Sequence, residues 1–243
     1  MTLFATFTDI LAVYWPFIAV FVVVAVLSGV TLGMLSKART DAAQTLDRLL
    51  VTNVDVYLER LTSNKRLKWV FRKSIIQFML LKGYIVKGDD DKALQCIRAL
   101  DSMRLEPQEK VEFLQTRISF FATRNNREEA LAGRDSLVNF LKKVKADKTD
   151  KYREILEEAD VIIKVYVEKD VNFIPSLIAK AAKTAHPVVR GITQYRIAKL
   201  AYFKQDEQLV TRYLQRAAKN LKGTSYQQIV ESALKDSSVL AEQ

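Results

Sequence analysis

The sequence contains one cysteine and one histidine, and only seven glycines and four prolines, among 243 residues. A single cysteine excludes an internal disulfide, and one cysteine with one histidine excludes the usual structural zinc sites. The scarcity of glycine and proline disfavours a turn-rich β-sandwich and favours long helices. Glycine-rich phosphate-binding motifs are also absent from the sequence, so we expect no cofactor.

The residues that could carry catalysis have simpler structural roles. His186 precedes Pro187, which is typical of the start of a helix, and Cys96 lies near Ile97 on an apolar helical face. The run Asp89–Asp91 lacks the spacing of a calcium-binding loop and suits a helix N-cap instead. The sequence therefore favours a protein that is not an enzyme and that holds no metal.

One stretch of the chain is uncharged throughout, from Ile10 to Ser36. As a helix it would be about 40 Å long, more than the ~30 Å hydrocarbon core of a bilayer. We therefore predict a single transmembrane helix over residues 10–36 after a short extracytoplasmic N-terminus, residues 1–9. A cleavable signal peptide fits less well, because the first 36 residues contain no Lys or Arg.

The charge distribution predicts an orientation. All 38 Lys and Arg residues follow Ser36, and the positive-inside rule then places the C-terminal part in the cytoplasm. We expect a single-pass protein of the cell inner membrane, with an organelle outer membrane facing the cytosol as the alternative. Ala25, Gly29 and Gly33 are four residues apart, a pattern that would let two such helices pair and form a homo-oligomer.

After residue 36, apolar residues recur at every third or fourth position, as they do on one face of a helix. The breaks between these runs are short, for example at Gly88 and at Asn125–Asn126. We therefore expect an all-α protein, with a juxtamembrane helix over 37–64 and a cytoplasmic domain of antiparallel helical pairs over 65–243. The length of this part corresponds to roughly nine or ten helices.

The segment from Leu80 to Tyr84, followed by Gly88, Ala93 and Ile97, resembles the tetratricopeptide repeat. In that family a Leu, a small residue and a Tyr mark the first helix of each pair, and an Ala and an apolar residue mark the second. Leu81 departs from this pattern, because the family has a small residue at its position.

A second copy of the repeat would have Arg117 and Arg134 at positions where the family has apolar residues. Its matching residues are Leu114, Ile118, Phe121 and Ala130. A third, weaker copy runs through Ile197, Leu200 and Leu209.

The resemblance implies a function. Arrays of such repeats form a concave surface that binds peptides or partner proteins, and they rarely catalyse reactions. It therefore implies a membrane-anchored scaffold or adaptor that docks other proteins. The groove-facing positions of the best copy would be Phe78, Lys82 and Ile85.

Two basic stretches support an alternative function, a membrane-tethered binder of polyanions that acts through its basic C-terminal third. Residues 65–73 interleave basic residues with Trp69, and residues 180–222 carry ten Lys and Arg against two acids. Such surfaces bind anionic lipid head groups, nucleic acid or acidic proteins. The candidate contact residues are Lys65, Arg66, Lys68, Trp69, Arg72, Lys73, Arg190, Arg196, Lys199, Arg212, Arg216 and Lys219.

Overall fold

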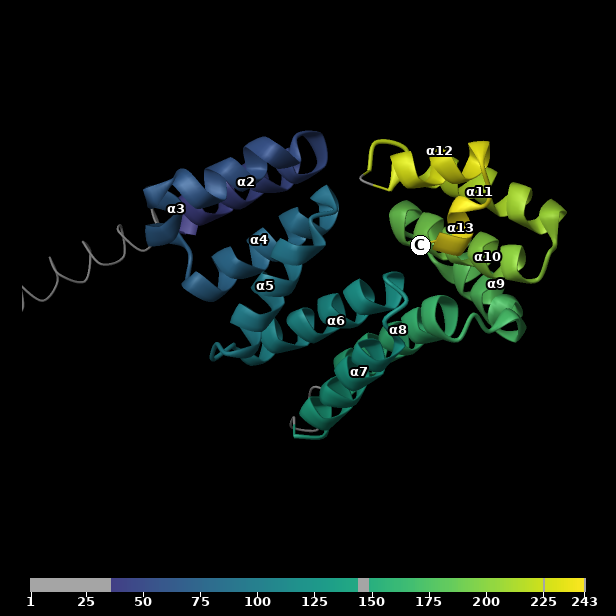
Figure 1. Cartoon of the computed structure of the whole chain (residues 1–243), viewed down its shortest axis with the longest axis horizontal. Helices are drawn as coiled ribbons and strands as arrows, with labels where there is room; N and C mark the ends of the chain where they lie inside the picture. The colour runs from purple at the N-terminus through teal and green to yellow at the C-terminus, as the bar shows by residue number, and fades with distance from the viewer. Residues whose placement is uncertain (1–35, 144–148, 225, 243) are drawn as a thin grey trace, which may run out of the picture. The chain divides into compact units, whose positions relative to one another are not determined.

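The computed structural model of the chain describes residues 36–143, 149–224 and 226–242 (Figure 1). Two units are distinguished, residues 1–76 and residues 77–243, and each is described by itself. All regular secondary structure in the described ranges is helical. The all-α part of the predicted fold class is therefore confirmed for these residues.

In the first unit, asparagines separate consecutive helices. Asn53 accepts a hydrogen bond on its side chain from the backbone N–H of Val56, and Asn64 does the same for Arg66. Both are N-caps, which provide an acceptor for a backbone N–H at the start of a helix. The elements are a helix over 36–52, α2 (Val54–Ser63), α3 (Lys65–Val70) and the start of α4 (Lys73–Lys87).

The second unit contains the rest of α4 and a succession of further helices. Most of its α-helices have 9 to 17 residues, and α13 has four. The elements in chain order are α5 (Asp90–Asp101), α6 (Pro107–Thr123), α7 (Arg127–Lys142), α8 (Thr149–Ile162), η2 (Ile163–Val167), η3 (Val171–Phe173), α9 (Ile174–Lys183), α10 (Pro187–Phe203), α11 (Glu207–Leu221), α12 (Gln227–Lys235) and α13 (Val239–Glu242).

Three of the turns between these helices share one backbone geometry. Each helix is followed by a residue with positive φ, namely Gly88 (77°), Asn125 (55°) or Gln205 (62°). This residue donates its N–H to a carbonyl three residues back, and the next residue donates to a carbonyl five residues back at 2.9 to 3.0 Å. This pair of bonds is the Schellman motif, which satisfies the last carbonyls of a helix.

The residue after the left-handed one also begins the next helix. The side chains of Asp89, Asn126 and Asp206 each accept a hydrogen bond from the backbone N–H three residues further on. One two-residue unit thus ends one helix and caps the next, so each pair forms a tight hairpin. The predicted breaks at Gly88 and at Asn125–Asn126 are confirmed.

The second unit has two hydrophobic cores that meet at η2. This element is a π-helical turn in which Glu168 donates its N–H to the carbonyl of Ile163 at 2.9 Å. On either side of it, Ile162 and Ile163 pack in the core that contains α5 to α7, whereas Val161 and Val165 pack in the core that contains α9 to α13. The α8–η2 segment therefore belongs to both cores.

The predicted transmembrane fold requires a correction. Within the described ranges, no helix is long and apolar enough to cross a membrane. The longest with defined ends, α6 and α10, have 17 residues and carry charged side chains, and that length gives about 26 Å against a ~30 Å hydrocarbon core. On this finding, the transmembrane part of the predicted fold class and the single-pass membrane location are wrong for the part of the chain that the structure describes. Residues 10–35, with Ala25, Gly29 and Gly33, lie outside the described residues.

Close packing of α10 against α11 depends on Gly191. A Cβ atom at this position would lie 2.6 Å from Leu221 Cγ and 3.0 Å from Asn220 Cβ. Such distances are below van der Waals contact, so we expect Gly191→Ala to lower the free energy of unfolding by about 1–3 kcal/mol, even though alanine favours helix. Urea denaturation followed by far-UV circular dichroism measures the change.

Gly133→Ala is the matched control. Its Cβ would make one close contact, 3.0 Å from the buried Ile118 Cγ1, and ordinary contacts of 3.8 and 3.9 Å with the backbone of Ile118. The gain of about 0.5–1 kcal/mol in helix propensity offsets that contact, and we expect a smaller change. Equal losses for the two variants would contradict the close approach at Gly191.

Candidate functional site

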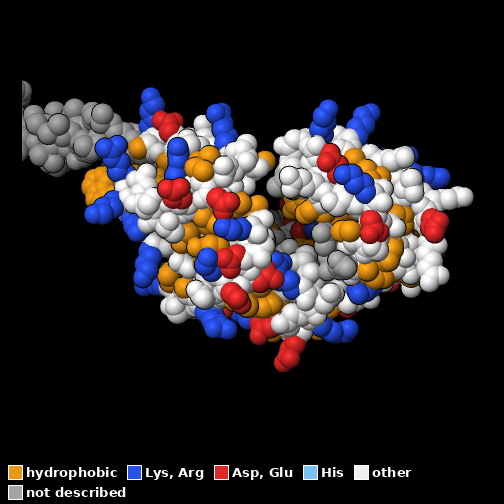
Figure 2. Space-filling model, turned by 45° about the horizontal axis from the view of Figure 1, so that its top comes forward, with side chains coloured by type: hydrophobic (Ala, Val, Ile, Leu, Met, Phe, Trp, Pro, Cys, Tyr) orange, Lys and Arg blue, Asp and Glu red, His pale blue; other side chains and the backbone are white. Residues whose placement is uncertain are grey.

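Helix α4 has several apolar side chains that are only partly covered. Of its large apolar side chains only Ile76 and Leu81 are buried, whereas Phe78 and Ile85 are half-buried and Val86 is 47% exposed. Since apolar surface is favourably removed from water, a helix with such a face is suited to contact another molecule. The space-filling view shows apolar patches among Lys, Arg, Asp and Glu side chains on the visible face (Figure 2).

The structure brings two of the predicted groove residues together and adds a third. Lys82 Nζ lies 4.5 Å from the centroid of the Phe78 ring and 2.7 Å from Glu112 Oε1 on α6. Ile85 is three residues beyond Lys82 and on the same side of α4. We call Phe78, Lys82, Ile85 and Glu112 the α4–α6 face. Glu112 was missed because an isolated glutamate carries no signal in the sequence.

The Lys82–Glu112 ion pair is open to solvent, with side-chain exposures of 42% and 50%. An exposed pair of this kind adds about 0.2–1 kcal/mol to stability. The face can therefore offer both charges to an incoming polar group at little structural cost, while Phe78 and Ile85 provide apolar contact.

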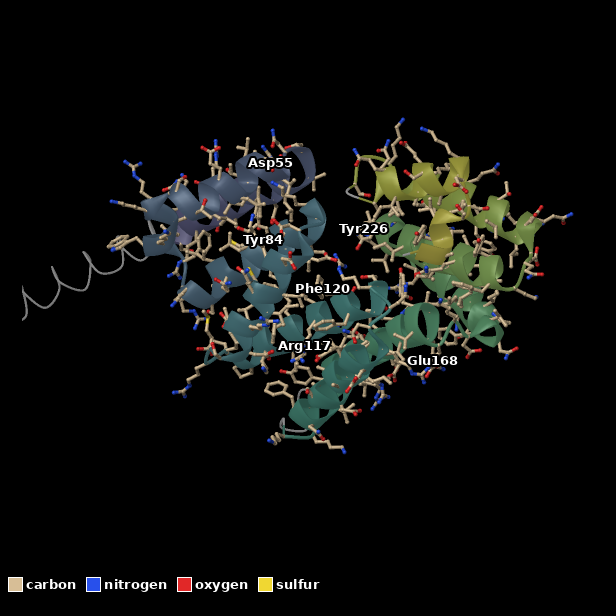
Figure 3. The ribbon with its side chains drawn as sticks, viewed as in Figure 1. Asp55, Tyr84, Arg117, Phe120, Glu168 and Tyr226 are labelled. Atoms are coloured by element: carbon tan, nitrogen blue, oxygen red, sulfur yellow. The ribbon has the colours of Figure 1, made fainter. Side chains whose placement is uncertain are left out.

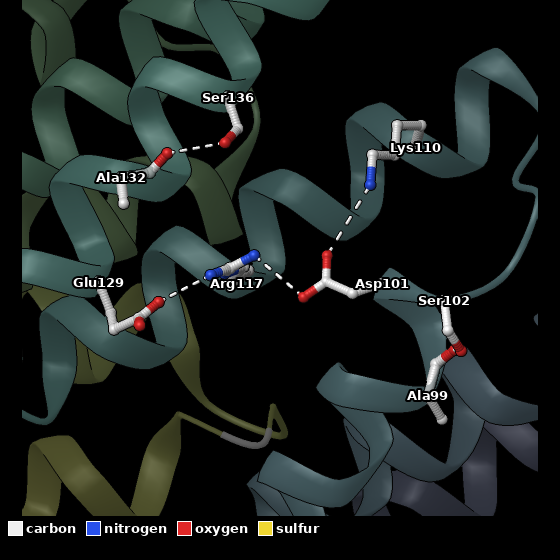
Figure 4. Close-up of polar contacts among 8 residues, drawn as sticks. All are labelled: Ala99, Asp101, Ser102, Lys110, Arg117, Glu129, Ala132 and Ser136. Atoms are coloured by element: carbon white, nitrogen blue, oxygen red, sulfur yellow. Dashed lines mark hydrogen bonds and ion pairs between the residues drawn. The ribbon is translucent and has the colours of Figure 1, made fainter.

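The neighbouring helices are tied by arginines at the positions where the repeat pattern calls for apolar residues. Arg117 on α6 donates to Asp101 at the end of α5 (3.0 Å) and to Glu129 in the first turn of α7 (2.7 Å), as Figure 4 shows. Lys110 lies 3.9 Å from the same Asp101 carboxylate. Arg134 on α7 repeats the arrangement with Asp160 on α8 at 2.6 Å. Both departures from the repeat are thus ion pairs between helices.

A further ion pair joins two of the Schellman turns. Arg124, at the end of α6, contacts Asp90 at the start of α5 at 2.5 Å and stacks 4.0 Å from the centroid of Phe120. Figure 3 places Phe120 and Arg117 on α6. The ion pair links the first two hairpins, and the cation–π contact with Phe120, on the same helix, orients the Arg124 guanidinium.

Arg196 was predicted on a basic surface, but it is buried in the second core. Its guanidinium lies 2.5 Å from Glu158 Oε1 on α8, and Lys180 of α9 lies 2.9 Å from Glu158 Oε2. Burial alone would raise the pKa of the Glu158 carboxyl, but the charges and hydrogen bonds of Arg196 and Lys180 outweigh it and hold that pKa below its usual value. Arg196 is therefore a structural residue, and its assignment to an anion-binding surface is wrong.

Lys199 is also buried, with only 1% of its surface exposed. Its ammonium group donates a hydrogen bond to the backbone carbonyl of Leu240 in α13 and lies 5.4 and 5.5 Å from the centroids of the Tyr166 and Phe203 rings. Burial, with a smaller effect from the charge of Lys169, lowers the pKa of Lys199 to about 8. Its predicted surface role is therefore wrong as well.

The other residues predicted to contact an anionic surface are exposed, except Arg190, which is half-buried. Trp69 on α3 is 84% exposed, although its neighbours Leu67 and Phe71 are buried. Arg190 is half-buried and donates to the carbonyl of Thr184 at 2.7 and 2.9 Å. The exposed cations are Lys65, Arg66, Lys68, Arg72 and Lys73 in the first unit and Arg212, Arg216 and Lys219 on α11.

Cys96 and His186 have the positions that the sequence predicts. Cys96 is buried on α5, and His186 is the N-cap residue of α10. In the described ranges, no three His, Cys, Asp or Glu side chains lie close enough together to hold a metal ion. No protein-family model, curated protein or solved structure matches this chain.

The buried Lys199 makes stability depend on pH. Its pKa is about 8 in the folded chain and 10.5 ordinarily, so between these values the unfolded chain holds a proton that the folded chain has lost. Stability should then rise with pH, by about 2 kcal/mol from pH 7.5 to 9.5. Urea denaturation across this range measures the slope.

Lys199→Met removes the titrating group. Between pH 7.5 and 9.5 we expect the free energy of unfolding of this variant to rise by about 2 kcal/mol less than that of the wild-type chain. The tyrosines with raised pKa, such as Tyr195, act above pH ~10 in the opposite direction and in both proteins. Parallel slopes in the two proteins would show that Lys199 is not the responsible group.

Proposed function

We propose that the chain is a protein-binding module that recognises a partner through the α4–α6 face. The observation that supports this most directly is the partly buried stripe of Phe78, Lys82 and Ile85 beside the open Lys82–Glu112 ion pair. An apolar anchor with polar groups at its edge is the usual arrangement of protein interfaces.

The hairpin architecture also supports a binding role. Three Schellman turns join helices into pairs, namely α4 with α5, α6 with α7 and α10 with α11. Where helical pairs of this kind stack, they expose extended surfaces for other chains. The weak resemblance of residues 80–97 to the tetratricopeptide repeat agrees with this proposal. The partner would contribute an apolar side chain to Phe78 and Ile85 and a polar or charged group to the ion pair.

Site-specific photo-crosslinking tests the proposal. A photoreactive phenylalanine analogue at Ile85 should give a discrete protein adduct in cells that produce the native chain, whereas the same analogue at exposed Gln95 on α5 should not. Phe78→Asp should reduce the Ile85 adduct at least tenfold, because it places a charge in the apolar contact. Gln95→Asp adds the same charge elsewhere and should leave the adduct unchanged.

A charge exchange separates binding from folding. Lys82→Glu combined with Glu112→Lys restores the ion pair within the chain but reverses the charges that a partner meets. We expect thermal stability close to that of the wild-type chain and loss of the adduct. A full adduct in this double variant, or equal adducts at positions 85 and 95, would contradict recognition by the α4–α6 face.

A second candidate function, polyanion binding, is favoured by Trp69. This side chain is 84% exposed and is surrounded in sequence by exposed Lys65, Arg66, Lys68 and Arg72. No acidic residue occurs between Glu59 and Asp89. An exposed indole can stack on a base while the cations meet phosphates.

Fluorescence anisotropy with a single-stranded oligonucleotide tests this second candidate. Binding should weaken steeply as salt is raised, and Trp69→Ala should weaken it by about 5- to 100-fold. Val51→Ala, at another exposed apolar side chain of the first unit, is the control. Binding that is insensitive to salt and to Trp69 would exclude this function.

A further inference from the structure

The last helix of the chain is attached to the rest by few contacts. Helix α13 has four residues, and of its described side chains only Leu240 is buried, with 0% exposure. The five residues before Val239, residues 234–238, are all exposed. A four-residue helix has no stability of its own, so α13 is held in place by what Leu240 contacts.

Leu240 lies in a site on α10 that is built around a buried charge. Its side chain packs in the second core, and its carbonyl accepts the hydrogen bond from Lys199. No carboxylate of a described side chain lies within ion-pair distance of Lys199, whose neighbours are the rings of Tyr166 and Phe203. A buried ammonium group without an acceptor is costly, so this site requires an oxygen acceptor from whatever occupies it.

Open space lies next to one of the two rings that border Lys199. A cavity of about 620 Å³ is lined by Phe203, which also lies beside Lys199, by Val210 of α11 and by Ala233 of α12. Ser237, in the segment before α13, forms another part of its wall. A ligand longer than α13 could therefore extend along this cavity.

We propose that Lys199 and Phe203 of α10, with Tyr166 of η2, form a peptide-binding site, and that residues 236–242 of the same chain are its resident occupant. Its ligands are short peptides that insert an aliphatic side chain where Leu240 lies and offer a carbonyl or carboxylate oxygen to Lys199. The C-terminal segment and an external peptide would then compete for one site. The proposal adds a second site to the binding function proposed above and does not depend on the α4–α6 face.

Binding of the segment in trans tests the proposal. The probe is a fluorescein-labelled synthetic peptide of residues 236–243, measured by anisotropy against three full-length chains. Leu240→Glu should release the attached segment and so bind the peptide. The wild-type chain and Ser238→Glu, which adds the same charge at an exposed position, should bind it at least tenfold more weakly, because their own segments occupy the site.

Two changes identify the contacts. The peptide with Leu240→Ala should bind the Leu240→Glu chain at least tenfold more weakly than the native peptide does. Lys199→Met in that chain should also weaken binding, because the acceptor loses its donor. Binding to none of the folded chains, or equal binding to all three, would overturn the proposal. If the peptide bound only under conditions in which the chains form dimers, the segment would be occupying the site of another copy. That result would overturn the proposal that it occupies the site of its own chain.

Hydrogen exchange on the wild-type chain keeps the test decisive if Leu240→Glu does not fold. The backbone amides of residues 240–242 should exchange at least a hundredfold faster than the protected amides in the middle of α10, because α13 detaches without unfolding the core. Exchange of both segments at the same rate would overturn the proposal. These outcomes are independent of crosslinking at Ile85, so either proposal can fail alone.

Discussion

The two-residue turn that ends one helix and caps the next determines how the second unit is built. In each of three hairpins the residue four positions after the capping side chain is fully or almost fully buried: Ala93 and Ala130 at 0%, and Val210 at 5%. The turn thus fixes the rotation of the second helix as well as its direction, because the capping residue and the buried residue lie one turn apart. Packing of each pair depends on that register.

Once the hairpins are formed, arginines help to determine which helices are neighbours. Arg117, Arg134 and Arg196 each reach a carboxylate on another helix, and their side chains are 10% to 34% exposed. Partly buried ion pairs add little net stability. Breaking one is nevertheless destabilising, because it leaves an unpaired charge where water solvates it poorly. We infer that these pairs act mainly by disfavouring other arrangements of the helices.

Much of this architecture could be predicted from the sequence, because turn and cap residues act locally. The sequence indicates two of the three Schellman turns, at Gly88–Asp89 and at Asn125–Asn126. The third was not recognised, since Gln205 is not a residue that usually adopts positive φ. The π-turn at Ile163–Val167 was also missed, because it inserts a residue without a distinctive side chain.

The candidate sites were harder to predict because their partners are distant in sequence. Arg196 and Lys199 looked like surface cations, yet Glu158 lies 38 residues from the first and the acceptor of the second is a backbone carbonyl 41 residues away. Trp69 was predicted as a surface contact residue, and its side chain is 84% exposed. Charge and periodicity thus located the helices but not which side each charge would face.

The two proposed sites differ in what covers them. At the C-terminal end of the second unit the cover is α13, which is held by Leu240 and by the bond from Lys199. Helix α4 keeps apolar side chains that are partly exposed, Phe78 and Ile85 among them. An open face and a lightly held cover are both suited to reversible binding, because a partner has little of the protein's own structure to displace.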